Sequence, residues 1–142
     1  MQLTTRRMAR IAIMLALTIV LDYVSTFIPF LKMPQGGQAT LGYIPLLVLA
    51  LVEGWIPALV GAFIFTFLQW IYTPPYVVHW AQFLLDYPLP VIVMVLLTAF
   101  SLFYKRPLTQ YYTAVVFTMA GSIIAYFLHV FAGVLFLSLI HI

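Results

Sequence analysis

The stretch "MARIAIMLALTIVLDYVSTFIPFL" (residues 8–31) decides the fold class. It is apolar and long enough to cross a lipid bilayer, which takes about 20 helical residues. With the arginines before it, it begins like a secretory signal peptide. However, its apolar part exceeds the roughly 7–15 residues of a signal-peptide core, and no small-residue cleavage site follows. We therefore interpret residues 8–31 as a retained first membrane helix.

The whole chain has the composition of an integral membrane protein. Of its 142 residues, 65% are hydrophobic and 6% are charged, with a mean hydropathy of +1.15. Soluble domains carry about 25% charged residues. The absence of cysteine excludes disulfides, thiolate metal sites and cysteine nucleophiles. The net charge of +3 indicates orientation in a membrane rather than nucleic-acid binding.

Turn signals divide the chain into five apolar segments, which predict an all-α bundle of five transmembrane helices in one domain, residues 1–142. A tight turn, "EGW" (53–55), separates the second segment from the third, and its Glu53 is expected to be solvated. A polar turn, "YKRPLTQ" (104–110), precedes the last segment. The five segments are 8–31, 42–52, 56–72, 81–103 and 112–137.

Clustered basic residues predict how the chain is oriented. Three arginines lie within residues 6–10, and Lys105 and Arg106 follow the fourth segment. An even number of crossings separates the two clusters, so both lie on one side, which the positive-inside rule makes cytoplasmic. The N-terminus is therefore predicted to be cytoplasmic, and the loops 32–42 and 73–80 exterior. Five crossings leave the C-terminus outside without a charged anchor, so we expect at least one further helix to be missing.

The stretch "FLLDYPLP" (83–90) places an aspartate, Asp86, within the apolar fourth segment. Ionisable residues at membrane depth are functional hypotheses by default because they are costly to bury. In a helix, His79, Gln82 and Asp86 share one face. Pro88 and Pro90 are tolerated in a first helical turn, so a regular helix is expected to start near Asp86.

Each of these polar residues also has a structural interpretation. Asp86 is then a helix N-cap carboxylate that accepts hydrogen bonds from backbone amides. Gln82 is then a helix-packing residue. His79 is then an interfacial residue that faces water, and Trp80 belongs to the aromatic belt at the membrane surface.

The fifth segment carries a comparable polar stripe. Ser122, Tyr126, His129 and Gly133 recur at spacings of four, three and four residues. His129 lies in the outer half of this segment, so it can share a depth with Asp86. It is interpreted either as a site residue or as a buried histidine that hydrogen-bonds a neighbouring helix.

The first segment has two faces. Ala12 and Ala16 belong to a small-residue stripe that suits close helix contact. A polar stripe beside it contains Asp22. This residue is interpreted as a second site carboxylate or, as we favour, as the partner of an internal hydrogen bond with Thr18 or Tyr23.

A carboxylate, a histidine and several aromatic residues near the outer surface describe a pocket for a small, flat, cationic ligand, because aromatic faces and carboxylates both attract cations. No Walker A motif is present, so the chain has no ATP site of that kind. Asp86, His79 and His129 do not match a recognised metal-ligand spacing, so no metal is predicted.

Three stretches, "KMPQGGQATLG" (32–42), "YVVHWAQFLLDYPLP" (76–90) and "YFLHVFAG" (126–133), resemble the thiamine-specific S component of energy-coupling-factor (ECF) transporters, the ThiT (YuaJ) family. The resemblance runs from the first segment to about Phe136. It implies a six-helix protein of a prokaryotic plasma membrane that binds thiamine from outside with high affinity. It also implies assembly with a transmembrane coupling protein (EcfT) and two ATPases. The chain itself is then neither an enzyme nor the holder of a cofactor.

The resemblance assigns roles to individual residues. It places Asp86, His129 and Tyr76 at positions that contact thiamine, with Gln82 close to the site. Tyr126 is a further candidate binding residue because it shares the polar stripe of His129, not because of the resemblance.

Two further pairs of residues also receive roles from the resemblance. Gly36 and Gly37 match a loop that closes over the ligand, where glycine permits a tight backbone path. Ala12 and Ala16 match the motif that docks the coupling protein.

The sequence departs from the family pattern at Ala125, where a lysine is expected, and at Leu137, where an aromatic residue is expected. Alternatives therefore stay open. In the nearest alternative, a protein of the same fold binds another vitamin or a thiamine precursor. A membrane enzyme with Asp86 and His129 as acid and base, and a structural subunit without a ligand, are less favoured.

Overall fold

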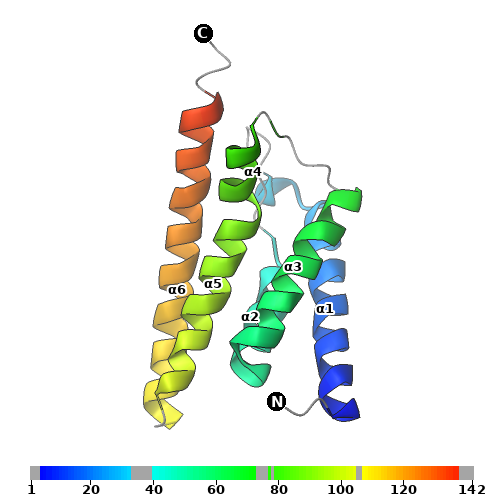
Figure 1. Ribbon diagram of the computed structural model, residues 1–142, viewed down its shortest axis with the longest axis vertical. Coiled ribbons are helices and arrows are strands. Elements are labelled where there is room, and N and C mark those ends of the chain that lie inside the picture. Colours follow the sequence, from blue (N-terminus) through cyan, green and yellow to red (C-terminus); the bar gives the residue numbers. More distant parts are fainter. Residues whose placement is uncertain (1–3, 33–39, 73–76, 78, 105–106, 138–142) are drawn as a thin grey trace. The chain divides into compact units, whose positions relative to one another are not determined.

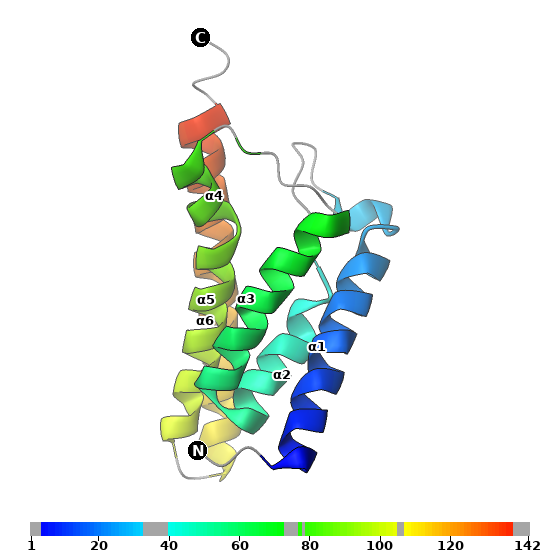
Figure 2. The same ribbon diagram turned by 45° about the vertical axis from the view of Figure 1, so that its right-hand side comes forward.

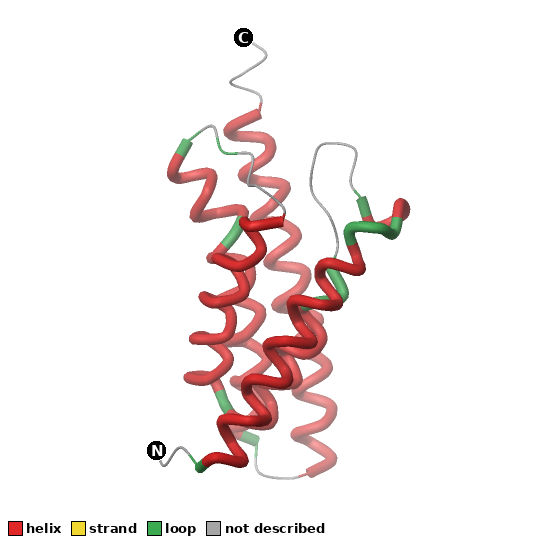
Figure 3. The backbone as a smooth tube through the Cα atoms, turned by 90° about the vertical axis from the view of Figure 1, so that its right-hand side faces the viewer, coloured by secondary structure: helices red, strands yellow, loops and turns green. Residues whose placement is uncertain are grey.

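The structure is a computed structural model that describes residues 4–32, 40–72, 77, 79–104 and 107–137. Within these ranges the chain forms helices joined by turns and contains no β-strand, as Figure 3 shows. The predicted all-α class is therefore confirmed. The chain consists of two compact units, Met1–Pro74 and Pro75–Ile142, which are described separately.

Unit 1 contains three mutually contacting helices, α1 (Thr5–Ser25), α2 (Tyr43–Glu53) and α3 (Trp55–Tyr72). Figures 1 and 2 show α2 beside both of its neighbours. Small residues permit this close packing. A Cβ atom built on Gly61 of α3 would lie 2.7 Å from the Leu15 side chain of α1.

The first helix begins with a cap and ends before a proline. The Thr4 hydroxyl accepts a hydrogen bond from the Arg7 backbone N–H, which satisfies one of the free donors at the helix start. The helix ends at Ser25 rather than at residue 31, and a short 3₁₀ helix, η1 (Pro29–Leu31), follows. Proline restricts the residue before it to extended backbone, and Ile28 is extended. The predicted end of the first segment was therefore wrong.

The turn between α2 and α3 was predicted correctly. Gly54 has a φ of 91°, and its N–H bonds to the Ala50 carbonyl at the end of α2. Residues that carry a Cβ atom rarely adopt this backbone conformation, which is why glycine commonly follows a helix.

Unit 2 contains α4 (Trp80–Asp86), α5 (Pro88–Phe100), the 3₁₀ helix η2 (Ser101–Phe103), α6 (Pro107–Ala132) and the π-helical turn η3 (Gly133–Leu137). The predicted segment 81–103 is therefore divided at Tyr87, and the regular helix that was expected to start near Asp86 starts at Pro88. Pro88 and Pro90 have no N–H to donate to carbonyls one turn earlier, so the continuous helical ladder stops at Asp86.

The last predicted segment also starts earlier than expected. Pro107 opens α6, because its fixed φ and missing N–H suit a first helical position. α5 and α6 lie side by side (Figure 1), with a Thr98–Thr118 hydroxyl contact of 3.0 Å between them. Gly121 permits this approach, since a Cβ there would lie 3.1 Å from the Met94 Cα.

Four stretches of the described chain are long and apolar enough to cross a membrane: Thr5–Ser25, Trp55–Tyr72, Trp80–Phe103 and Leu108–Phe136. The helix α2 is apolar but shorter. The four long stretches correspond to four of the five predicted segments, and α2 corresponds to the fifth, residues 42–52, which was predicted to be short.

Candidate functional site

Asp86 is the last residue of α4, and its carboxylate holds two polar partners within unit 2. The Gln82 amide nitrogen lies 3.3 Å from Oδ2, and His129 Nδ1 lies 3.3 Å from Oδ1. The side chains of Asp86 and His129 are 19% and 43% exposed. These are long, partly exposed contacts, so the carboxylate keeps acceptor capacity for another group.

The pair forms because of where two helices end. Asp86 stops α4 at the proline break, and His129 lies in the last turn of α6, which contacts α4. The predicted common depth of Asp86 and His129 is thus confirmed as a direct contact.

The N-cap interpretation of Asp86 was wrong. The residue before α5 is Tyr87, which makes no side-chain cap bond. Pro88 and Pro90 supply no N–H in the first turn of α5, so few backbone donors remain there for a capping carboxylate. The predicted shared face is confirmed for Gln82 and Asp86, which lie one turn apart on α4. It is wrong for His79, because this residue has extended backbone and precedes the helix.

Gln82 is both a helix-packing residue and a neighbour of the site carboxylate. Its side chain is buried, with 4% of the residue exposed, and it also donates to Asp86. It therefore packs within unit 2 and helps to orient the carboxylate.

His79 precedes α4 and is exposed, in agreement with its water-facing interpretation. Its Nδ1 accepts a hydrogen bond from the Ala81 N–H at 3.1 Å, so the imidazole itself caps α4. Its ring stacks on Phe136 of η3, with ring centroids 5.7 Å apart and planes 12° apart. Sequence reasoning missed Phe136, although it lies seven residues after His129 and so two turns further along.

Other predicted site residues lie elsewhere or outside the described residues. Tyr126 is 55% exposed, its ring packs edge-on against Phe127 at 5.8 Å, and it takes no part in the Asp86–His129 pair. Tyr76, Gly36 and Gly37 lie outside the described residues. Their roles stay predictions.

Asp22 is enclosed within unit 1. It has no exposed surface, the Tyr72 hydroxyl donates to Oδ2 at 2.5 Å, and the Gln69 amide donates to both carboxylate oxygens at 3.3 Å. An internal hydrogen bond was predicted, but the named partners were wrong. The Thr18 hydroxyl donates to the Met14 carbonyl instead. The Tyr23 ring packs edge-on against the Tyr72 ring and does not hydrogen-bond to Asp22.

Glu53 is not solvated, contrary to the sequence-based expectation. Its side chain is 3% exposed, and its carboxylate lies 2.6 Å from Arg7 Nε and 2.8 Å from an Arg10 nitrogen. Arg7 also donates to the Glu53 carbonyl, at 2.8 Å. These ion pairs join the start of α1 to the end of α2. The sequence did not predict them, because Arg7 and Glu53 are 46 residues apart in the chain.

Ala12 and Ala16 lie exposed on α1, on a different face from the buried Thr18, Asp22 and Ser25. Their docking role stays a prediction.

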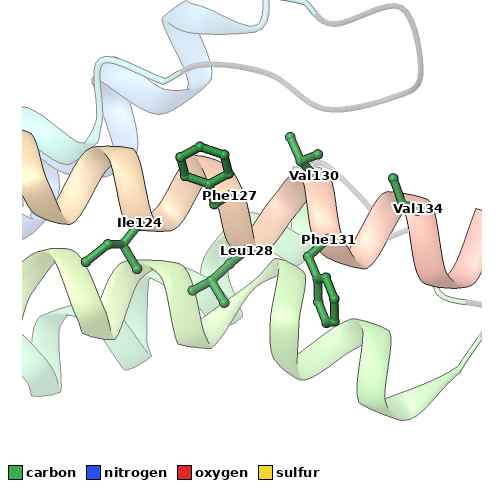
Figure 4. Close-up of a pocket in the computed structure, with 6 residues that line it drawn as sticks. All are labelled: Ile124, Phe127, Leu128, Val130, Phe131 and Val134. Carbon is green, nitrogen blue, oxygen red and sulfur yellow. The ribbon is translucent and has the colours of Figure 1, made fainter.

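An open apolar groove of about 490 Å³ runs along α6 and η3 (Figure 4). Carbon-rich side chains line it, so it offers little hydrogen bonding to a polar ligand and suits lipid chains or another apolar helix. It is therefore distinct from the Asp86–His129 pair. The residues that line it are Ile124, Phe127, Leu128, Val130, Phe131 and Val134.

No group of three or more histidine or acidic side chains suited to a metal ion occurs among the residues that the structure describes. The Asp86–His129 site offers a carboxylate and an imidazole. These groups can form hydrogen bonds with a ligand, and the carboxylate can attract a cation.

Comparison with known proteins adds one finding. A family model described as "Thiamine transporter protein (Thia_YuaJ)" matches residues 8–139, a range that reaches into every described helix of both units. No curated protein and no solved structure matches the chain.

Proposed function

This chain belongs to the thiamine transporter family, and we propose that it is the thiamine-binding subunit, or S component, of an ECF-type importer. In this role it captures thiamine at the outer face of a prokaryotic plasma membrane. It is a transport subunit and not an enzyme.

One observation carries the choice of binding site. The sequence contains three acidic residues. Asp22 is enclosed by donors of unit 1, and Glu53 is enclosed by two arginines. Asp86 differs, because its side chain is 19% exposed and its contacts with Gln82 and His129 are both 3.3 Å long, whereas Asp22 and Glu53 each have a contact of 2.6 Å or less. A ligand can therefore reach Asp86 without breaking a tightly held internal network.

The chemistry of thiamine fits this carboxylate. The ligand has a flat aminopyrimidine ring with N–H donors and a flat thiazolium ring with a positive charge. A carboxylate accepts charge-assisted hydrogen bonds from the N–H groups of the aminopyrimidine ring. It also attracts the positive charge of the thiazolium ring. His129 supplies a further hydrogen bond, and Gln82 orients the carboxylate through their 3.3 Å contact.

The remaining roles come from the family resemblance. Tyr76 contributes to the same site, and Gly36 and Gly37 belong to the loop that closes over the ligand. The exposed Ala12 and Ala16 dock the coupling protein (EcfT). Two ATPases joined to that protein supply the energy, so the chain needs no cofactor of its own.

Titration of the purified chain with thiamine in detergent tests the proposal. We expect saturable quenching of tryptophan fluorescence, reproduced by calorimetry, and loss of binding in Asp86→Asn. Other vitamins and thiamine precursors serve as competitors, and a tighter competitor identifies a different ligand. Unchanged thiamine affinity in Asp86→Asn contradicts the proposed site.

A further inference from the structure

One exposed face of α1 carries a continuous stripe of side chains with two arginines at its start. Arg6 and Arg10 lie one turn apart, and apolar residues continue the stripe at alternating spacings of three and four residues. All members of this stripe, which we name the α1 stripe, are exposed. They are Arg6, Arg10, Ile13, Leu17, Val20 and Val24.

Arg10 is oriented by an internal partner and still offers donors to a second one. One of its terminal nitrogens lies 2.8 Å from Glu53 Oε1, while 53% of its side chain stays exposed. A guanidinium carries five N–H donors, so a single contact leaves others available. Glu53 therefore fixes the direction of the Arg10 side chain without using all of its N–H groups.

The start of α1 has an excess of positive charge. Arg7 neutralises Glu53, since its Nε lies 2.6 Å from the carboxylate, and the Glu53 side chain is 3% exposed. Arg6 is exposed and forms no ion pair within the part of the chain that the structure describes. The charges of Arg6 and Arg10 therefore remain uncompensated, and both residues belong to the α1 stripe.

The apolar part of the α1 stripe has the length of one bilayer leaflet. From Ile13 to Val24 the helix rises about 16 Å, at about 1.5 Å per residue. Half of a hydrocarbon core of about 30 Å is about 15 Å. The acyl chains of one leaflet can therefore lie along this part of the stripe while the headgroup lies beside the arginines.

The side chains of the α1 stripe favour a lipid over a second helix. Close helix contacts in membranes use small residues, which Ala12 and Ala16 supply beside the stripe, whereas the stripe itself carries branched isoleucine, leucine and valine. Arginine binds phosphate oxygens through paired N–H donors. The positive-inside rule assigns this end of α1 to the cytoplasmic side, where anionic lipids attract basic residues near the membrane.

We propose that Arg6 and Arg10 bind the headgroup of an anionic phospholipid whose acyl chains lie along the apolar part of the α1 stripe. This lipid site goes beyond the proposed function, because it needs neither thiamine nor Asp86. A lipid bound there also lies beside Ala12 and Ala16, the residues predicted to dock the coupling protein.

A tryptophan placed in the α1 stripe measures which lipid lies beside it. Leu17→Trp is combined with Trp55→Phe, Trp70→Phe and Trp80→Phe, which remove the native tryptophans. The chain is reconstituted in phosphatidylcholine vesicles with a minor share of phosphatidylglycerol, and the acyl chains of one lipid at a time carry bromine, which quenches a tryptophan in contact with it. We expect brominated phosphatidylglycerol to quench more than its share of the lipid accounts for. Phe63→Trp, on an exposed position of α3, is the matched control and is expected to follow the bulk composition.

Replacing the arginines tests the headgroup contact in the Leu17→Trp chain. Arg6→Gln and Arg10→Gln are each expected to lower the preference for phosphatidylglycerol about fivefold. Arg6→Lys combined with Arg10→Lys keeps both charges and is expected to retain most of the preference. Lys32→Gln removes an exposed positive charge beyond the other end of α1 and is expected to change nothing.

Three outcomes overturn the lipid site. The first is equal quenching by the two brominated lipids at Leu17→Trp. The second is a preference that persists in both Arg6→Gln and Arg10→Gln, which would assign these residues to a protein partner. The third is displacement of brominated phosphatidylglycerol by inorganic phosphate at the same concentration, which would identify free phosphate as the ligand. Thiamine affinity is measured separately on the same variants, so the lipid site can fail while the proposed function stands.

Discussion

The tripeptide Leu-Asp-Tyr occurs once in each unit, at residues 21–23 and 85–87, and the two aspartates have opposite environments. Asp22 has no exposed surface and receives the Tyr72 hydroxyl at 2.5 Å. The Asp86 side chain is 19% exposed, with partners at 3.3 Å. Identical neighbours in sequence therefore do not decide whether a carboxylate is structural or available to a ligand.

The packing around each helix end explains the difference between the two aspartates. Asp22 lies in the last turn of α1, on the face that packs against α3, where Gln69 and Tyr72 donate to its carboxylate. Asp86 is the last residue of α4, before the proline break, and its contacts with Gln82 and His129 leave 19% of its side chain exposed. The comparison leads to four predictions.

Replacing each aspartate by alanine is expected to have the largest effect at Asp22. Asp22→Ala leaves two partly buried donors, the Gln69 amide and the Tyr72 hydroxyl, without their acceptor, which costs about 3 kcal/mol of unfolding free energy. Asp86→Ala is expected to cost less than about 1 kcal/mol, because His129 is partly exposed. Thermal unfolding in detergent measures both, and equal losses would contradict the assigned difference.

Ligand affinity is expected to show the reverse order. Asp86→Asn removes the charge that faces the proposed ligand, and we expect thiamine affinity to fall about 10- to 100-fold. Asp22→Asn keeps a buried acceptor for Tyr72, and we expect less than about a threefold change. Calorimetry measures the thiamine affinity of both variants. A larger loss of affinity in Asp22→Asn would place the binding site in unit 1.

The third carboxylate sharpens the comparison, since Glu53 is buried like Asp22 but paired with cations. We expect Glu53→Gln to lower the free energy of unfolding by about 1–2 kcal/mol. Arg7→Gln is expected to approach this value, while Arg10→Gln stays below about 0.5 kcal/mol, because the Arg10 side chain is 53% exposed. Thermal unfolding measures these losses. Equal losses in the two arginine variants would contradict the prediction that Arg7 stabilises the protein more than Arg10.

The smallest expected effect isolates one hydrogen bond. Tyr72→Phe removes the hydroxyl that donates to Asp22 and is expected to cost about 1 kcal/mol. Tyr126→Phe is the control, on an exposed position of α6, and is expected to stay within about 0.5 kcal/mol. Thermal unfolding in detergent compares the two, and a Tyr72→Phe variant as stable as this control would show that Gln69 alone satisfies Asp22.

Much of the site was predictable because it depends on local periodicity. Helical spacing placed Gln82 and Asp86 on one face, and the outer position of His129 predicted the shared depth. The aromatic partner Phe136 was not predicted. A phenylalanine in an apolar segment gives no signal of its own until the opposite helix is known.

The sequence by itself determined the membrane class, the helical segments, the turn at Gly54 and the candidate pair of Asp86 and His129. These features arise from apolar length, periodicity and backbone chemistry, which act over a few residues. The tertiary structure decided the partners of Asp22 and Glu53 and the stack of His79 on Phe136. Those partners lie far away in the chain, and only packing of whole helices brings such groups within hydrogen-bonding or stacking distance.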